Sequence, residues 1–227
     1  MAHSVLIIAE SGSGKSTSGR TLDSKETFWI NIANKPLPFK GWKKDYTLIS
    51  KDNPKGNMTN ASSAIGIMKA IQHVNDKMPH IDNLVIDDWQ YMSAFEYFDK
   101  ANEKGYDKFT SIASNLAQVA KMPKDLRDDL YCFFLTHSES TTDINGRNKI
   151  KAKTVGKMID NALTLEGLFS IVLFGKVVRE EDGTMRYGFQ TQTDGETTGK
   201  SPMGMFEESF IENDLQFVKD CIIEYEQ

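Results

Sequence analysis

The chain has 227 residues and a formal net charge of −5, which suits one well-buried domain better than two. Hydrophobic residues make up 39% of the chain and charged residues 26%, and no apolar run approaches the roughly 20 residues that span a bilayer. The start lacks the pattern of a secretory signal, and two cysteines, Cys132 and Cys221, supply neither a disulfide framework nor a zinc site. We therefore expect a single domain over residues 1–227, without a membrane segment, in a reducing cytoplasm.

Short β-branched runs predict strands, and longer stretches with apolar periodicity predict helices. In chain order, strands are expected at 5–9, 27–32, 46–49, 84–87, 131–136, 169–178 and 185–193. Helices are expected at 15–22, 62–75, 90–100, 109–121, 156–163 and 214–225. The early strands are almost wholly apolar, which is typical of a parallel sheet covered by helices on both faces. The sequence thus predicts an α/β fold with a mostly parallel central sheet, and the turn at 180–183 predicts a C-terminal antiparallel hairpin.

The first strand runs into a glycine-punctuated turn, LIIAESGSGKST. This turn fits the phosphate-loop pattern with Ala9 in place of the first glycine, a position that mainly needs a small residue. Gly12 and Gly14 let backbone amides face a phosphate, Lys15 reaches the β- and γ-phosphates, and Ser16 binds Mg²⁺. The alternative is a glycine turn without a ligand. The expected nucleotide-binding residues are Ala9, Glu10, Ser11, Gly12, Ser13, Gly14, Lys15, Ser16 and Thr17.

Acidic and polar residues follow two further strands, where a phosphate loop needs its partners. In NLVIDDWQ, Asp87 directly follows an apolar run and is the expected Mg²⁺ ligand beside Ser16, while Asp88 either polarises the attacking water or caps the next helix. In CFFLTHSES, His137 either contacts the terminal phosphate or is structural, and Glu139 is an alternative base. Asp88, His137, Glu139 and Lys15 belong to the expected catalytic set.

Five motifs in this order resemble the RecA-type P-loop ATPases: AESGSGKST, LVIDDWQ, a strand ending FFLTH, KTVGKMIDNALTLEG and TTGKSPMGMF. The chain is most similar to short phage proteins that keep only the RecA core, the AAA-domain ATP-binding proteins that include the Sak-four group of single-strand annealing proteins. The resemblance implies a RecA-like core, ATP and Mg²⁺ as cofactors, and a homo-oligomeric ring or filament in the host cytoplasm. Implied partners are single-stranded DNA and a phage single-stranded DNA-binding protein.

Two further segments take roles from this resemblance. The loop 138–157 would face the axis of the ring and touch single-stranded DNA, although it lacks the aromatic residues that stack on bases. The alternative is a solvated loop whose lysines have no ligand. Lys200 would complete the expected catalytic set by reaching the γ-phosphate of a neighbouring subunit, as an arginine finger does, or is an ordinary loop cation. The basic residues expected to bind DNA are Arg147, Lys149, Lys151, Lys153 and Lys157.

One departure from the family concerns the catalytic glutamate, which RecA-like enzymes place at or just after the second strand. Here TFWINIANKP has Asn31 and Asn34 but no acid. Either Asp88, Glu10 or Glu139 replaces it, or hydrolysis is slow. We therefore expect a Mg²⁺-dependent ATPase acting on single-stranded DNA in phage recombination, annealing or replication. The alternatives are a small-molecule (nucleotide) kinase, disfavoured because the few arginines do not cluster, and a nucleotide-gated assembly protein with little hydrolysis.

Overall fold

The computed structural model describes residues 1–142, 145–155 and 164–227, in which strands and helices alternate over the first half and strands predominate from residue 131 to residue 212. The strands are β1 (His3–Ala9), β2 (Thr27–Asn31), β3 (Met58–Thr59), β4 (Asn83–Asp87), β5 (Tyr131–Thr142), β6 (Asn148–Ala152), β7 (Ile171–Arg179), β8 (Met185–Gln190) and β9 (Phe210–Glu212). The α-helices are α1 (Trp42–Asp45), α2 (Ala64–Lys77), α3 (Gln90–Asp99), α4 (Asp107–Lys121) and α6 (Leu215–Tyr225). Three 3-10 helices cover Ser16–Thr21, Met122–Asp125 and Leu165–Leu168.

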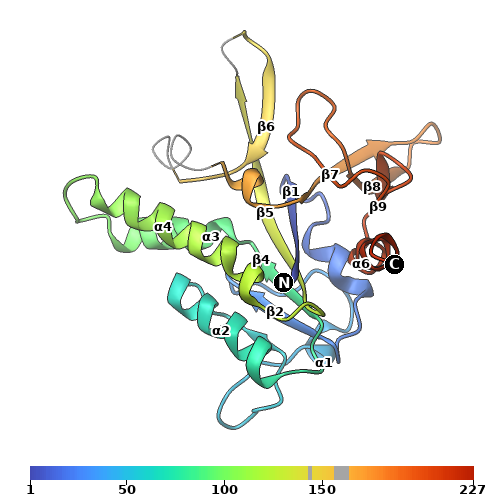
Figure 1. Ribbon diagram of the computed structural model, residues 1–227. Coiled ribbons are helices and arrows are strands. Elements are labelled where there is room, and N and C mark those ends of the chain that lie inside the picture. Colours follow the sequence, from blue (N-terminus) through green and yellow to red (C-terminus); the bar gives the residue numbers. More distant parts are fainter. Residues whose placement is uncertain (143–144, 156–163) are drawn as a thin grey trace.

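The strands form one mixed sheet in the order β3-β2-β4-β5-β1-β7-β8-β9, with β6 paired to β5 outside this path. The strands from β3 to β7 along that order run parallel, and β8 and β9 continue antiparallel. Helices α2, α3 and α4 lie on one side of the sheet, and α6 lies with the first 3-10 helix on the other (Figure 1). The expected α/β fold, mostly parallel sheet and C-terminal antiparallel hairpin are confirmed. No helix of the described residues is long and apolar enough to cross a bilayer.

Two hydrophobic clusters explain why the central strands are apolar on both faces. Alternate residues of β1 point to opposite sides, so that Leu6 and Ile8 belong to the cluster under α2–α4 while Val5 and Ile7 belong to the cluster under α6. Trp89 is fully buried in the first cluster against Phe134 and Phe169. The two clusters hold the strands rigidly, and therefore also fix the loops at their carboxyl ends.

The predicted strand at 46–49 is wrong, because its residues make only an isolated bridge between Leu48 and Met58 and the edge strand is β3. Tyr46 is buried instead in an aromatic group with Trp29 and Phe39. The Asn57 side chain accepts a hydrogen bond from the backbone N–H of Thr47. Side-chain packing and an asparagine thus replace the strand pairing that the β-branched pattern suggested.

The predicted helix at 15–22 is a short 3-10 helix over Ser16–Thr21. The Ser18 hydroxyl donates to the carbonyl of Lys15 and the Thr21 hydroxyl to that of Ser18, bonds that suit a tight turn. Gly19 lies against the Trp29 ring, where an added Cβ would come within 2.7 Å of ring carbons. The turn therefore packs too closely on the sheet for a larger residue at this position.

The predicted loop at 138–157 is largely a β-hairpin, because β5 continues to Thr142 and pairs with β6. The signal was present in NKIKA, whose alternating apolar residues place Ile150 against the core and bury Ala152. This hairpin projects from the carboxyl edge of the sheet (Figure 1). The predicted helix at 156–163 and Lys157 lie outside the described residues.

Candidate functional site

The carboxyl ends of the parallel strands bring the predicted site residues together at one edge of the sheet. In the strand register Ala9 is level with His137, and Asn31 is level with Asp87. The turn after β1, residues 9–17, is called the glycine loop here. Gly12 and Gly14 have φ values of 82° and 87°, which only glycine adopts readily.

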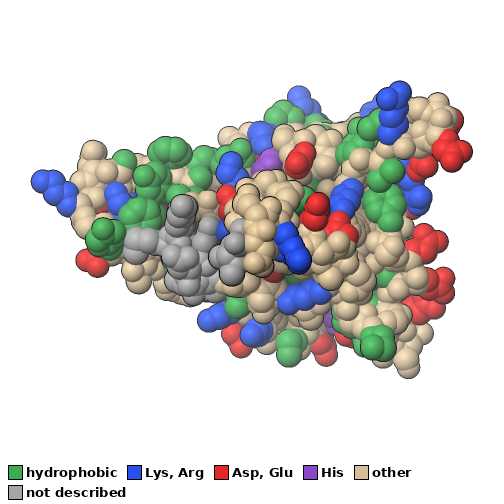
Figure 2. Space-filling model, turned by 90° about the horizontal axis from the view of Figure 1, so that it is seen from above, with side chains coloured by type: hydrophobic (Ala, Val, Ile, Leu, Met, Phe, Trp, Pro, Cys, Tyr) green, Lys and Arg blue, Asp and Glu red, His purple; other side chains and the backbone are tan. Residues whose placement is uncertain are grey.

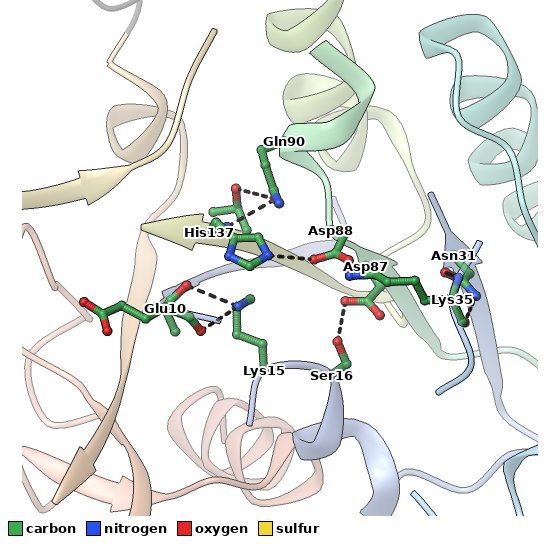
Figure 3. Close-up of polar contacts among 11 residues, drawn as sticks. Glu10, Lys15, Ser16, Asn31, Lys35, Asp87, Asp88, Gln90 and His137 are labelled. Carbon is green, nitrogen blue, oxygen red and sulfur yellow. Dashed lines mark hydrogen bonds and ion pairs between the residues drawn. The ribbon is translucent and has the colours of Figure 1, made fainter. Parts of the chain in front are cut away.

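Lys15 folds back over the glycine loop rather than out into solvent. Its ammonium donates to the carbonyls of Ala9 and Glu10, at 3.2 and 2.9 Å, and the residue is only 5% exposed (Figure 3). Burial lowers the pKa of Lys15, although the negative charges of Asp88 and Asp87 act against that change. The loop thus holds a buried cation next to backbone carbonyls and two carboxylates.

Ser16 and Asp87 lie far apart in the sequence but touch in the structure. The Ser16 hydroxyl donates a hydrogen bond of 2.8 Å to Asp87 Oδ1, which joins the start of the 3-10 helix to the end of β4. The two oxygen ligands predicted from the sequence are therefore adjacent. Asp87 is buried, and burial together with the charge of Asp88 raises its pKa to about 6.

Asp88 is held by two partners of its own. Its carboxylate forms ion pairs with Lys35 Nζ and, at 3.2 Å, with His137 Nε2. Burial acts to raise the pKa of Asp88, but hydrogen bonds with His137 and Lys35 outweigh it and lower the pKa to about 2. The predicted helix-cap role is wrong, because α3 starts without a side-chain cap and Asp88, at φ 58°, directs its carboxylate to these cations instead.

His137 is anchored from several directions. Its backbone N–H donates to Gln90 Oε1 at 3.2 Å, and the neighbouring Thr136 hydroxyl donates to the same oxygen at 3.1 Å. The Tyr91 ring meets the imidazole edge-on at a centroid distance of 6.1 Å. Gln90 therefore ties the end of β5 to the start of α3, and this link was not predicted.

Sequence reasoning also missed Lys35, which reaches the site from the connection after β2. Asn31 holds the Lys35 backbone at both groups: its Nδ2 donates to the Lys35 carbonyl at 2.6 Å, and its Oδ1 accepts from the Lys35 N–H at 3.2 Å. Asn34, between them, has φ 51° and accepts from Asn60 Nδ2. Asn31 and Asn34, which stand where the family would place an acid, thus shape a turn. Asparagine is common in turns because its side chain bonds the nearby backbone.

A cavity of about 780 Å³ opens from the glycine loop along its Thr17 end. Its far wall is formed by β8 and the segment after β9, with Arg186, Tyr187 and Asn213 among the lining residues. Arg20, also in the lining, donates to the carbonyls of Thr17 and Asn213. The size falls within the usual range of small-molecule sites.

The alternative bases lie elsewhere. The Glu10 carbonyl faces Lys15, while its exposed carboxylate points away from it (Figure 3). Glu139 lies two residues beyond His137 on β5 and is ion-paired with Lys151 of β6 at 3.3 Å. Lys200 pairs through its backbone with Val172, which is level with Leu6 and so about 10 Å before the carboxyl end of β1. Neither Glu139 nor Lys200 joins the cluster of Lys15, Asp87 and Asp88.

The predicted DNA-binding residues are distributed along the hairpin rather than in a free loop. Arg147 is exposed before β6, the Lys149 ammonium bonds to the carbonyl of Gly195, and Lys153 donates its backbone N–H to the His137 carbonyl at 2.8 Å. In the view from above, the Lys and Arg side chains of the described residues are interspersed with acidic side chains and form no single continuous patch on that face (Figure 2).

Ser16 and Asp87 are the side chains of this site that could hold a divalent cation together with phosphates. Within the described residues no three His, Cys, Asp or Glu side chains group as a metal site. Mg²⁺ bound together with phosphates takes only one or two protein oxygens, which the Ser16 hydroxyl and the buried Asp87 carboxylate would supply.

No protein-family model matches this chain, and a search of curated proteins finds no related sequence.

Proposed function

We propose that this protein binds a nucleoside triphosphate with Mg²⁺ in the glycine loop, as a RecA-like ATPase does. The observation that carries the proposal is the contact between Ser16 and Asp87, with the buried Lys15 beside it. An ammonium, a hydroxyl and a carboxylate, the groups that triphosphate binding uses, lie together at two strand ends, which supports the proposal. The adjoining cavity of about 780 Å³ offers room for the nucleoside.

Each residue has a separate task in this proposal. Lys15 would exchange its backbone carbonyl partners for phosphate oxygens, and the loop amides around Gly12 and Gly14 would bind the phosphates. Ser16 and Asp87 would hold Mg²⁺, which when bound offsets charge on the phosphates. Asp88 and His137 lie beside them, where a water attacking the terminal phosphate would be oriented.

The state of Asp88 favours slow hydrolysis. A carboxylate ion-paired with both Lys35 and His137, with its pKa lowered to about 2, is a weak proton acceptor. This supports the assembly alternative, in which bound ATP stabilises an oligomer and is hydrolysed poorly. We propose single-stranded DNA as the polymer on which the oligomer assembles, with the β5–β6 hairpin as the contact and Lys200 acting across a subunit boundary.

Titration calorimetry with ATP, in the presence and absence of Mg²⁺, tests the proposed nucleotide site. The unmodified protein is expected to bind Mg-ATP, and Lys15→Ala to weaken binding by about 100-fold or more because phosphate charge loses its buried partner. ATP hydrolysis measured with and without single-stranded DNA then tests the reaction.

Lys44→Ala is the matched control for lost lysine charge, because Lys44 lies in α1 on an exposed surface. It should bind Mg-ATP like the unmodified protein. Absence of ATP binding by the unmodified protein would exclude the proposed nucleotide site. Binding without stimulation by DNA would leave the site intact and reject the DNA role.

A further inference from the structure

The site contains a second lysine, Lys35, at a position where the resemblance to RecA-like enzymes predicts no lysine. Lys35 stands on the turn after β2, where RecA-like enzymes were expected to carry an acid. Its ammonium pairs with Asp88, and its side chain is 57% exposed while that of Asp88 is 5% exposed. The Lys35 ammonium thus covers a buried carboxylate, while more than half of the Lys35 side chain stays exposed to solvent.

The Lys35 backbone is held by hydrogen bonds, which keep its side chain at this end of the site. The Asn31 side chain bonds both the N–H and the carbonyl of Lys35, and Asn31 is itself 4% exposed at the end of β2. Because Asn31 is level with Asp87, the turn stands directly beside the predicted Mg²⁺ ligand. The Tyr91 ring, 5.6 Å from the ammonium, guides the side chain from the other side.

Lys15, from the glycine loop, and Lys35, from the turn after β2, lie near the same two carboxylates, Asp87 and Asp88. The charges of Asp88, Asp87 and Lys35 all act on Lys15, and those of Asp88 and Asp87 act on Lys35 (Figure 3). A Mg-bound triphosphate remains anionic, and placing it beside two carboxylates calls for more positive charge than Lys15 supplies. A flexible, exposed ammonium at this position can turn from Asp88 to a phosphate oxygen by side-chain rotation alone.

We propose that Lys35 binds the terminal phosphate of the nucleoside triphosphate, so that this chain supplies from its own β2 turn a cation that recognises the γ-phosphate. The inference rests on the proposed nucleotide site. Lys15 then serves every nucleotide with a β-phosphate, whereas Lys35 distinguishes the triphosphate from the diphosphate. Asn31 is a positioning residue, since it acts through the Lys35 backbone.

Binding of two nucleotides separates these roles. In Mg²⁺, Lys35→Ala and Lys35→Gln should each weaken a non-hydrolysable ATP analogue by about tenfold or more, and leave ADP affinity within about twofold. Lys35→Arg should restore most of the analogue affinity, because it keeps the charge. Lys40→Ala is the matched control: an exposed lysine of the same connection, expected to bind both ligands normally.

The retained ADP affinity also reports that each variant is folded. Equal loss of ADP and analogue binding in both neutral variants, or no loss of either, would overturn the role of Lys35 while leaving the nucleotide site standing. If the unmodified protein bound neither ligand, the proposed function would fall and this inference with it. A selective loss that Lys35→Arg did not reverse would likewise contradict a role for the charge.

Discussion

The glycine-loop site and the β5–β6 hairpin both present charged residues at the carboxyl edge of the sheet, but they hold them differently. At the site, Lys15 and Asp87 are buried. The Lys15 ammonium donates to the carbonyls of Ala9 and Glu10, and Asp87, held by the strand register, accepts from Ser16. On the hairpin, Lys149 and Lys151 are partly exposed and contact groups of the hairpin or of the segment after β8. The first arrangement concentrates fixed charges at one point, where the nucleotide site is proposed, and the second spreads charges along a projecting element, where the DNA contact is proposed.

The largest expected effect on stability comes from Asp87→Asn at the site. The pKa of Asp87 rises from an ordinary 3.8 to about 6 on folding, so the folded state binds more protons between these values and the ionised carboxylate destabilises the protein above pH 6. Asp87→Asn should therefore raise the free energy of unfolding at pH 8 by on the order of 2–3 kcal/mol, and change it little at pH 4. Thermal melts without Mg²⁺ or nucleotide measure this.

The same variant, Asp87→Asn, should lose affinity for Mg-ATP by roughly 10–100-fold, because a metal ligand is removed.

Asp88→Asn is the stability control of opposite sign. The pKa of Asp88 is lowered to about 2, so its ionised form stabilises the fold above pH 4 and stability is lost as the pH falls toward 2. Asp88→Asn should thus lower stability at pH 8. A gain in stability from both variants would contradict the distinction between the two carboxylates.

A smaller effect is expected on the hairpin from the combined change Lys149→Ala, Lys151→Ala and Lys153→Ala. Loss of three phosphate contacts should weaken single-stranded DNA by about tenfold at low salt and reduce the slope of log affinity against log salt by about 2. Fluorescence anisotropy with oligothymidine measures both. Removing three exposed lysines elsewhere, Lys51, Lys55 and Lys104, provides the control for overall charge. An unchanged salt slope in the hairpin variant would reject the hairpin as a DNA contact.

Local pattern predicted which residues of the glycine loop and β4 meet, but not the residues that surround them. Gly12, Lys15 and Ser16 lie in one short loop, and Asp87 ends an apolar strand, so parallel pairing alone predicts that they meet at one edge. Lys35 gave no such signal, because its place depends on the Asn31 side chain bonding a turn. Likewise the pairing of β9 with β8 depends on a strand that follows a long connection, since Gln190 is level with Phe210. The β5–β6 hairpin, by contrast, joins strands close in sequence, and the alternating pattern of NKIKA could have predicted it.

The smallest effect is expected from Glu139→Gln. This change tests whether Glu139 acts at the glycine-loop site or only on the β5–β6 hairpin. Its carboxylate contacts Lys151 at 3.3 Å, and both side chains are 27% exposed, so the pair contributes about 1 kcal/mol at most. Glu139→Gln should leave the ATP hydrolysis rate within about twofold, whereas Asp88→Asn, which changes a carboxylate beside Asp87, should lower it. Removing a negative charge next to Lys151 should also strengthen DNA binding by less than about threefold. A large loss of hydrolysis in Glu139→Gln with nucleotide affinity retained would instead make Glu139 the base, and would require the hairpin to bend back over the glycine loop when nucleotide binds.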